Sequence, residues 1–375
     1  MPVTAPTPVP QSTPTPCRLT CACHGIDLHA HVVPQQFPAY LGSRAPAGWP
    51  STAAARDAAG LCHRQVLVGG KHDRTVNEKC WPAPRRLADL PAMGLQAQVL
   101  SPMPELLPYW LDLADAQPLL RFLNEHTAAM CAASADRLLG LAAVPLQNLD
   151  AAICELRHAV EVLGLVEVEL GSNINGAVIG DARFDAFFAA CVALDVPVFV
   201  QALKPTGMHR SVGPAPLQQV PAYPTDVGLA AASVITGGLL QRHPALRIGF
   251  SHGGGTLALL LPRLRQGWAV FPALADSLAE PPVQQARRLF FDTLVFDAAT
   301  LRHLLATFGT QALMLGTDDP FNFHEPAPLR RLLDAGLDPA TQAALAHGNA
   351  RRFLGPRADH RLAAALIANN QERPA

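Results

Sequence analysis

Residues 26–31, Ile26-Asp27-Leu28-His29-Ala30-His31, end a short apolar run with a His-x-His pair. In a β-strand, side chains two residues apart point to the same face. A strand that ends here would therefore present the imidazoles of His29 and His31 side by side, an arrangement that binds divalent transition metals. Two unrelated histidines are the alternative, and the endings of the later strands decide between the two readings.

From Gly25 onward the chain alternates strand-like and helix-like segments. Eight mostly apolar segments are predicted as buried strands: 26–31, 96–101, 138–145, 165–171, 196–203, 246–252, 289–295 and 312–318. Helices are predicted between them at 116–133, 150–163, 182–194, 227–242, 255–268 and 298–308. This alternation is typical of a parallel sheet, and eight units predict an α/β protein with a TIM-type (β/α)8 barrel. An open doubly wound sheet is the alternative, but no glycine-rich phosphate loop follows the first strand.

The remaining segments suggest how the chain is organised around the barrel. Residues 1–24 are rich in Pro and are predicted to be a disordered leader, with Cys17, Cys21 and Cys23 as free thiols. The barrel is expected to span 25–356, with an insertion after its first strand at about 32–79 that covers the carboxyl end of the barrel. The end of the chain, from about residue 325, is predicted to be helical and to pack outside the barrel, with 357–375 as a C-terminal helix and tail.

Composition narrows the class of protein. Of 375 residues, 49% are apolar and 16% are charged, and the net charge is −1. This balance does not favour binding to nucleic acid or to an anionic membrane. No apolar run is long enough for a membrane span, and the first residues lack the pattern of a secretion signal. We therefore expect a cytoplasmic protein in which the eight cysteines are reduced.

Several predicted strands end in polar or ionisable residues. Burying such a group costs free energy unless it is paired or bound to a ligand. The carboxyl ends of parallel barrel strands share one rim, which is where the active sites of such barrels lie. A metal or catalytic cluster is therefore predicted from the side chains that end strands one, four, five, six and eight: His29, His31, Glu169, Gln201, His252 and Asp318.

Four short motifs resemble those of the amidohydrolase superfamily. Within it the chain is most similar to the branch that contains aminocarboxymuconate-semialdehyde decarboxylase and related nonoxidative decarboxylases. The resemblance covers about residues 25–356. It rests on Asp27-Leu28-His29-Ala30-His31, Lys79-Cys80-Trp81, Phe250-Ser251-His252-Gly253-Gly254-Gly255 and Leu315-Gly316-Thr317-Asp318-Asp319-Pro320-Phe321.

The resemblance implies a metal and a proton-transfer group. His29, His31 and Asp318 would hold one divalent metal, with zinc as the first choice and manganese or cobalt as alternatives. His252 would be the catalytic acid/base residue beside the metal, and Asp318 would assist it as the second catalytic residue.

The resemblance also implies residues that bind a substrate. Arg74 matches an arginine that binds a substrate carboxylate. Arg263 matches an arginine that is offered to the site of the neighbouring subunit in a homodimer. Apart from the resemblance, Trp81 lies close to Arg74 in sequence and is a candidate for stacking on a planar substrate, although ordinary packing is the simpler interpretation. The expected partners are therefore a small carboxylate substrate and a second copy of the chain, without nucleic acid or membrane.

Gln201 departs from the family pattern, which places a metal-binding histidine at the end of strand five. A neutral amide oxygen binds zinc more weakly than an imidazole does. Three outcomes stay open: Gln201 binds the metal through oxygen, a water takes this place, or the metal is weakly bound or absent. His209, on the loop after strand five, is a further candidate, although an ordinary loop histidine is the simpler interpretation.

The leading functional hypothesis is metal-dependent nonoxidative decarboxylation of an unsaturated or aromatic carboxylic acid, and the resemblance selects this reaction more than the residues do. Hydrolysis of an amide, ester or lactone by the same metal site is the first alternative. The second alternative is a catalytically weak barrel that binds a small acid, because Gln201 replaces a family ligand.

Overall fold

The computed structural model describes residues 25–56, 62–210, 212–213 and 218–362. The predicted leader, with Cys17, Cys21 and Cys23, lies outside these residues, as does the tail from 363 onward. No helix among the described residues is long and apolar enough to span a membrane.

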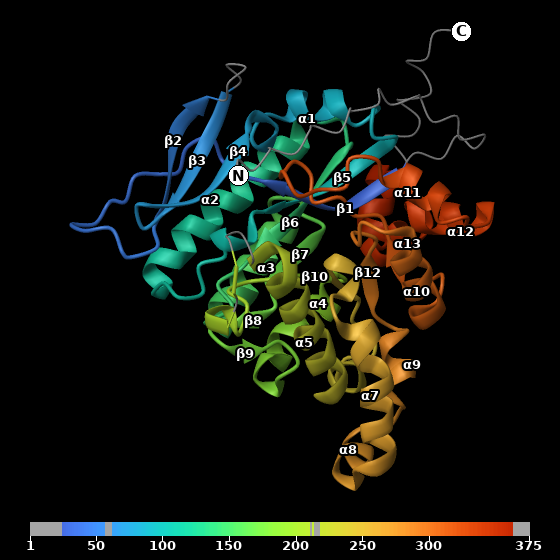
Figure 1. Cartoon of the computed structure of the whole chain (residues 1–375). Coiled ribbons are helices and arrows are strands. Elements are labelled where there is room, and N and C mark those ends of the chain that lie inside the picture. The colour runs from blue at the N-terminus through green and yellow to red at the C-terminus, as the bar shows by residue number, and fades with distance from the viewer. Residues whose placement is uncertain (1–24, 57–61, 211, 214–217, 363–375) are drawn as a thin grey trace, which may run out of the picture.

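Eight parallel strands form the central sheet (Figure 1). In spatial order they are β1 (Gly25–Val32), β5 (Leu95–Pro102), β6 (Leu138–Ala143), β7 (Glu167–Gly171), β10 (Val198–Gln201), β11 (Ile248–Phe250), β12 (Phe290–Asp292) and β13 (Leu313–Met314). The segment after β13 returns to β1, where Leu28 donates to the carbonyl of Leu315 over 2.9 Å and Ala30 bridges Asp319. The ring therefore closes, which confirms the predicted TIM-type barrel.

Helices surround the ring, and their positions follow the predicted alternation. The main ones are α2 (Leu113–Ala132), α3 (Leu149–Glu161), α4 (Asp185–Ala193), α5 (Tyr223–Thr236), α7 (Leu257–Val270) and α10 (Ala298–Phe308). The helix predicted at 227–242 is two helices, because Gly238 adopts a left-handed φ of 68° between α5 and α6 (Leu239–Arg242). The last strand is shorter than predicted. From Leu315 onward the backbone forms isolated hydrogen bonds, to β1 and to Leu345, and no longer pairs with β12.

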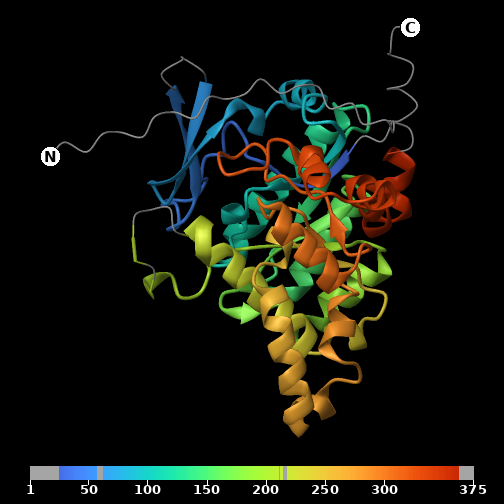
Figure 2. The same cartoon turned by 45° about the vertical axis from the view of Figure 1, so that its right-hand side comes forward.

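The insertion after β1 contains a three-stranded antiparallel sheet that was not predicted. It consists of β2 (Pro50–Arg56), β3 (Cys62–Val68) and β4 (Lys71–Asn77), and it stands at one side of the ring (Figures 1 and 2). Arg74 of β4 lines the same cavity as His29 of β1. The insertion therefore covers the carboxyl end of the barrel, as the sequence predicts.

The C-terminal extension covers the opposite, amino end of the ring. It includes α11 (Pro328–Asp334), α12 (Pro339–Ala343) and α13 (Asn349–Leu354), and residues 356–362 are also helical. Phe353 and Leu362 belong to the same buried cluster as Ile26 and Leu139 of the barrel strands. The extension lies outside the ring of strands, as expected, and its apolar side chains also close the base of the barrel.

Candidate functional site

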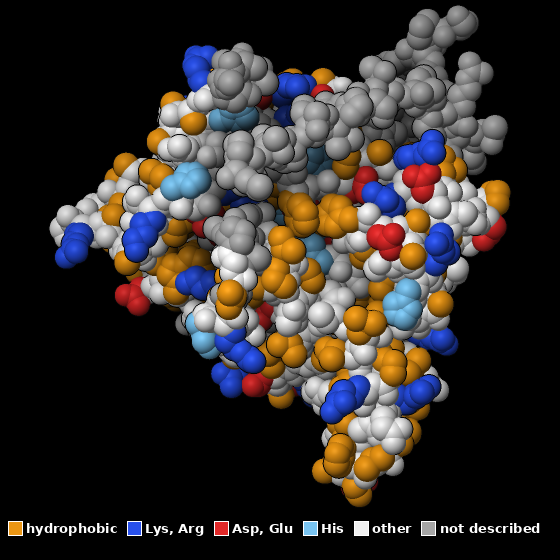
Figure 3. All heavy atoms as spheres, viewed as in Figure 1, with side chains coloured by type: hydrophobic (Ala, Val, Ile, Leu, Met, Phe, Trp, Pro, Cys, Tyr) orange, Lys and Arg blue, Asp and Glu red, His pale blue; other side chains and the backbone are white. Residues whose placement is uncertain are grey.

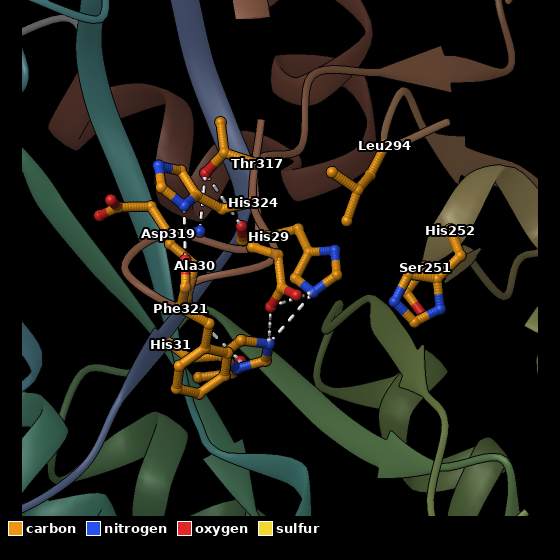
Figure 4. A network of polar contacts seen from close by, with 12 residues as sticks. His29, Ala30, His31, Ser251, His252, Leu294, Thr317, Asp319, Phe321 and His324 are labelled. Atoms are coloured by element: carbon orange, nitrogen blue, oxygen red, sulfur yellow. Dashed lines mark hydrogen bonds and ion pairs between the residues drawn. The ribbon is translucent and has the colours of Figure 1, made fainter. Parts of the chain in front are cut away.

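Three side chains form a compact triangle at the carboxyl end of the barrel. The Nε2 atoms of His29 and His31 are 3.1 Å apart, and Oδ1 of Asp318 lies 3.4 Å from the first and 3.0 Å from the second. Atoms bound at about 2.1 Å to one zinc ion in tetrahedral geometry lie about 3.4 Å apart. The two imidazoles point toward one another in Figure 4. The structure thus brings together the predicted ligands at separations that fit a single divalent ion.

Asp27 fixes the backbone around this triangle. Its buried carboxylate accepts hydrogen bonds from the amide of His29, the side chain of Gln98, and both the amide and the hydroxyl of Thr317. Burial raises the pKa of Asp27 to about 6, although these hydrogen bonds oppose the rise. The amide of Asp318 donates to the carbonyl of His29 over 2.7 Å. β1 and the segment after β13 are thereby locked together where the three predicted ligands lie.

Asp292 is a functional candidate that the sequence reasoning missed. Its Oδ2 lies 2.7 Å from Nδ1 of His29, and its carboxylate also accepts hydrogen bonds from the amides of His252, Gly253 and Leu294. A carboxylate in this position holds Nδ1 protonated and leaves Nε2 free to bind a metal. Asp292 is the last residue of β12, but it lies inside the predicted strand 289–295, so the reasoning from strand endings did not find it.

The charges around His29 favour a cation. Burial alone would lower the pKa of His29, but its hydrogen bonds with Asp292 and Asp318 raise this pKa to about 10. Asp292 is buried and the side chain of Asp318 is 15% exposed, and neither carboxylate forms an ion pair with an arginine or lysine among the described residues. A divalent ion next to His29 would supply the positive charge that this arrangement stabilises.

His252 stands beside the triangle on another element. It follows β11 and has a left-handed φ of 54°, and its ring centroid lies 5.6 Å from that of His29. Ligand atoms of His29, His252 and Asp318 all lie within 4.8 Å of one another. Burial, with a smaller contribution from His29, lowers the pKa of His252 to about 4. The imidazole is therefore neutral near pH 7 and able to accept a proton.

Gln201 occupies the predicted place at the end of β10. It is 1% exposed and lines the cavity, and its Nε2 atom has no hydrogen-bond partner among the described residues. A buried amide with an unmet hydrogen bond is uncommon and points to a missing ligand or water. His209 is exposed in a 3-10 turn and does not line this cavity, so the structure does not support it as a substitute ligand.

A cavity of about 380 Å³ opens above the triangle. It is large enough for one small organic molecule. Its outer wall includes Arg74, Glu105, Tyr223, Phe321 and Phe323. The guanidinium of Arg74 lies 4.3 Å from the ring centroid of Phe321 and donates to Glu105 over 2.9 Å. The predicted carboxylate-binding arginine thus shares one cavity with the predicted metal ligands.

Two predicted substrate-binding residues lie elsewhere. Trp81 is half-buried against the hydrophobic core and is not part of the wall of this cavity. Arg263 is exposed on α7, also away from the cavity. Glu169 of β7 is fully buried, and neither of its carboxyl oxygens has a hydrogen-bond partner among the described residues. Burial raises the pKa of Glu169 well above its usual range.

Comparison with known proteins places these features in a family. The family model described as Amidohydrolase matches residues 26–355. The 2-amino-3-carboxymuconate-6-semialdehyde decarboxylase of Dictyostelium discoideum is 32% identical over 337 residues, which cover 88% of this chain and 91% of that protein.

Two solved structures show the same fold at lower identity. The IDCase of Metarhizium anisopliae is 18% identical, with a TM-score of 0.74 over 90% of this chain and 98% of that one. A dihydroxybenzoic acid decarboxylase from Polaromonas sp., crystallised with bound manganese and an inhibitor, is 23% identical, with a TM-score of 0.63 over 72% of this chain and 85% of that one.

The half-buried Asp73 generates a prediction about pH and stability. Burial raises its pKa to about 6 in the folded protein, and Glu105 adds to the rise. In the unfolded chain this pKa is about 3.9. The folded protein therefore binds more protons between these values, and Asp73 makes it less stable as the pH rises through them. We expect Asp73→Asn to unfold at a higher urea concentration than the wild type at pH 8, and the difference to narrow toward pH 4.5.

Asp276→Asn, on an exposed position of α8 (Pro272–Ser277), is the matched control and should follow the wild type at both pH values. An Asp73→Asn variant that shows the same difference at pH 8 and pH 4.5 would contradict the prediction.

Proposed function

The chain belongs to the amidohydrolase family, and we propose that it is a metal-dependent nonoxidative decarboxylase of an unsaturated or aromatic carboxylic acid. The observation that carries the proposal is the triangle of His29, His31 and Asp318 in one cavity with His252 and Arg74. The similarity to the Dictyostelium decarboxylase supports the reaction, because it extends over nearly the whole of both chains.

We propose one divalent metal as the cofactor, held by His29, His31 and Asp318, with the amide oxygen of Gln201 as a fourth ligand. Zinc suits the two imidazoles, and manganese suits the harder oxygen ligands. The position of Gln201 supports its assignment, because this residue is 1% exposed and lines the same cavity as His29, His31 and Asp318. When bound, such a metal polarises a substrate oxygen and stabilises negative charge that develops on the substrate.

The protein's own residues bind the substrate and move a proton. The planar guanidinium of Arg74 fits a carboxylate, which places the substrate between the outer wall and the triangle. Phe321 stacks on His31 with ring centroids 4.9 Å apart and gives the cavity an apolar side that excludes water. As the carbon–carbon bond breaks, its electron pair stays on the carbon and carbon dioxide leaves. The same carbon then takes a proton. His252 would first accept this proton from water at an imidazole nitrogen and then donate it to the carbon.

One observation favours a second candidate function. Gln201 stands where the family has a histidine, and a weaker ligand lowers metal affinity. A catalytically weak barrel that binds a small acid without turnover would keep the same cavity and the same Arg74. If the purified protein takes up no metal until Gln201→His is introduced, this second candidate is the better description.

We also propose a cytoplasmic location, on the basis of the composition of the chain.

We propose in addition that the protein is a homodimer. Arg263 is exposed on α7, where the sequence resemblance places an arginine that serves the neighbouring subunit. Leu259, Val270 and Phe271 of the same region are 74%, 56% and 62% exposed. Figure 3 shows hydrophobic side chains gathered at the end of the molecule formed by α7 and α8. Exposed apolar groups on one projecting element suit an interface between subunits.

Sedimentation equilibrium tests the homodimer. We expect twice the mass of one chain for the wild type, and a shift toward the monomer when Leu259 and Phe271 are both replaced by Ser. A wild-type protein that sediments as a monomer at all concentrations would contradict the proposal.

The reaction is tested on metal-loaded protein with aromatic and muconate-like carboxylic acids. We expect release of carbon dioxide without hydrolytic products, and loss of activity after removal of the metal by a chelator. His252→Asn should lower kcat by about 10²- to 10⁴-fold, because the proton-transfer group is lost. His209→Asn, outside the cavity, is the matched control. Hydrolysis of esters or lactones without release of carbon dioxide would favour the hydrolase alternative.

The role of Asp292 is tested by metal binding instead of activity. We expect Asp292→Asn to lower the affinity for zinc or manganese by about 10- to 100-fold, because the amide no longer holds the imidazole of His29 in one tautomer. Asp297→Asn is the control, since Asp297 is the exposed N-cap of α10 and asparagine caps a helix equally well. Equal affinities for the two variants would show that Asp292 has no part in the metal site.

A further inference from the structure

Glu105 joins two walls of the cavity through a single oxygen atom. It lies in the 3-10 turn Pro104–Leu106 that follows β5, and its side chain is 17% exposed. Its Oε1 accepts a hydrogen bond from Nη2 of Arg74 over 2.9 Å and another from the hydroxyl of Tyr223 over 2.5 Å. Arg74 comes from β4 of the insertion and Tyr223 from the first residue of α5. Three separate segments of the chain therefore meet at this carboxylate.

Each of the two donors leads to a different part of the site. Arg74 lies over the ring of Phe321, which is stacked on His31 of the triangle with an interplanar angle of 19°. Tyr223 is stacked on His252, with ring centroids 6.4 Å apart and an interplanar angle of 18°. The carboxylate of Glu105 thus connects the metal side of the cavity to the acid/base side.

These bonds hold groups that would otherwise be free to move. An arginine side chain loses much rotamer freedom when it is fixed, and a buried charge left without its partner is costly. No other hydrogen bond from the Arg74 guanidinium is present among the described residues. Asp73 adds negative charge nearby but forms no bond to Arg74. Glu105 is therefore the group that sets the orientation of Arg74.

We propose that Glu105 is a positioning residue, which holds the Arg74 guanidinium toward the substrate carboxylate and the Tyr223 ring against His252. It acts through these two side chains and does not itself take part in proton transfer. The inference rests on the proposed function, because it assumes that Arg74 binds a carboxylate. It adds to that function a residue that neither the sequence resemblance nor the predicted strand endings indicate.

A double-mutant cycle on the metal-loaded protein tests the path through Arg74, with benzoate as the probe and calorimetry as the measurement. We expect Glu105→Ala to raise the Kd for benzoate about tenfold, as for a lost hydrogen bond to a charged group. Arg74→Ala should raise it at least as much. The double variant should bind no more weakly than Arg74→Ala alone, because Glu105 acts through Arg74.

The path through Tyr223 is tested by steady-state kinetics. Tyr223→Phe keeps the ring that stacks on His252 but loses the hydroxyl that donates to Glu105. We expect it to lower kcat while the Kd for benzoate stays within twofold, whereas Glu105→Ala should raise KM as well. Such a split between kcat and KM would not arise from a general loss of structure.

Two controls keep the outcome clear. Glu105→Gln retains the side-chain volume, and it should also raise the Kd for benzoate if Glu105→Ala unfolds. Glu78→Gln, at an exposed site of the insertion, should have the same Kd as the wild type. Tighter benzoate binding by the Glu105 variants would overturn the proposal, since Glu105 would then compete with the substrate for Arg74. Additive effects of the two alanine variants would also overturn it. Benzoate binding is measured without turnover of a substrate. A protein that shows the expected Kd values in the double-mutant cycle but releases no carbon dioxide would therefore contradict the proposed decarboxylase function and leave the role of Glu105 intact.

Discussion

The site depends on closure of the barrel. The backbone of the segment after β13 bonds to β1 through Leu28, His29 and Ala30, so residues almost 300 positions apart in sequence lie side by side. Asp27 adds side-chain bonds at the same seam, because its carboxylate accepts from both the amide and the hydroxyl of Thr317. Without this seam, Asp318 would have no fixed position relative to the two imidazoles. The chemistry proposed for the protein therefore follows from how the ring of strands is joined.

The local pattern of apolar and polar residues was enough to predict the repeating strands of the barrel. Apolar runs separated by amphipathic segments predicted all eight strands and the ring they form, because burial of both faces leaves a clear signal in each strand. Strand endings predicted His29, His31, Gln201, His252 and Asp318 as neighbours, because parallel strands place their carboxyl ends on one rim. The structure places all five around one cavity, whereas Glu169, which was predicted in the same cluster, is buried in β7 and does not line it.

Other features depend on contacts that no local pattern specifies. Asp292 supports His29 from a strand whose ending was not considered, and it is distinguished only by the bonds it makes after folding. Glu105 lies in a short turn and meets Arg74 and Tyr223 through tertiary packing. Trp81 shows the opposite case, since its closeness to Arg74 in sequence predicted a role in the cavity, but its ring packs against the core. The insertion sheet was missed because its strands are mixed in polarity and only partly buried.

The arginine that faces the cavity belongs to the insertion sheet, whereas the triangle belongs to the ring of strands. Apart from Pro50 and Val76, the residues of β2 and β4 are exposed or only partly buried. If Arg74 binds the substrate as proposed, changes in the insertion would alter which acids enter, while the three proposed metal ligands stay on the barrel. On the proposed function, substrate preference could therefore diverge through the insertion while the ring of strands keeps the reaction the same.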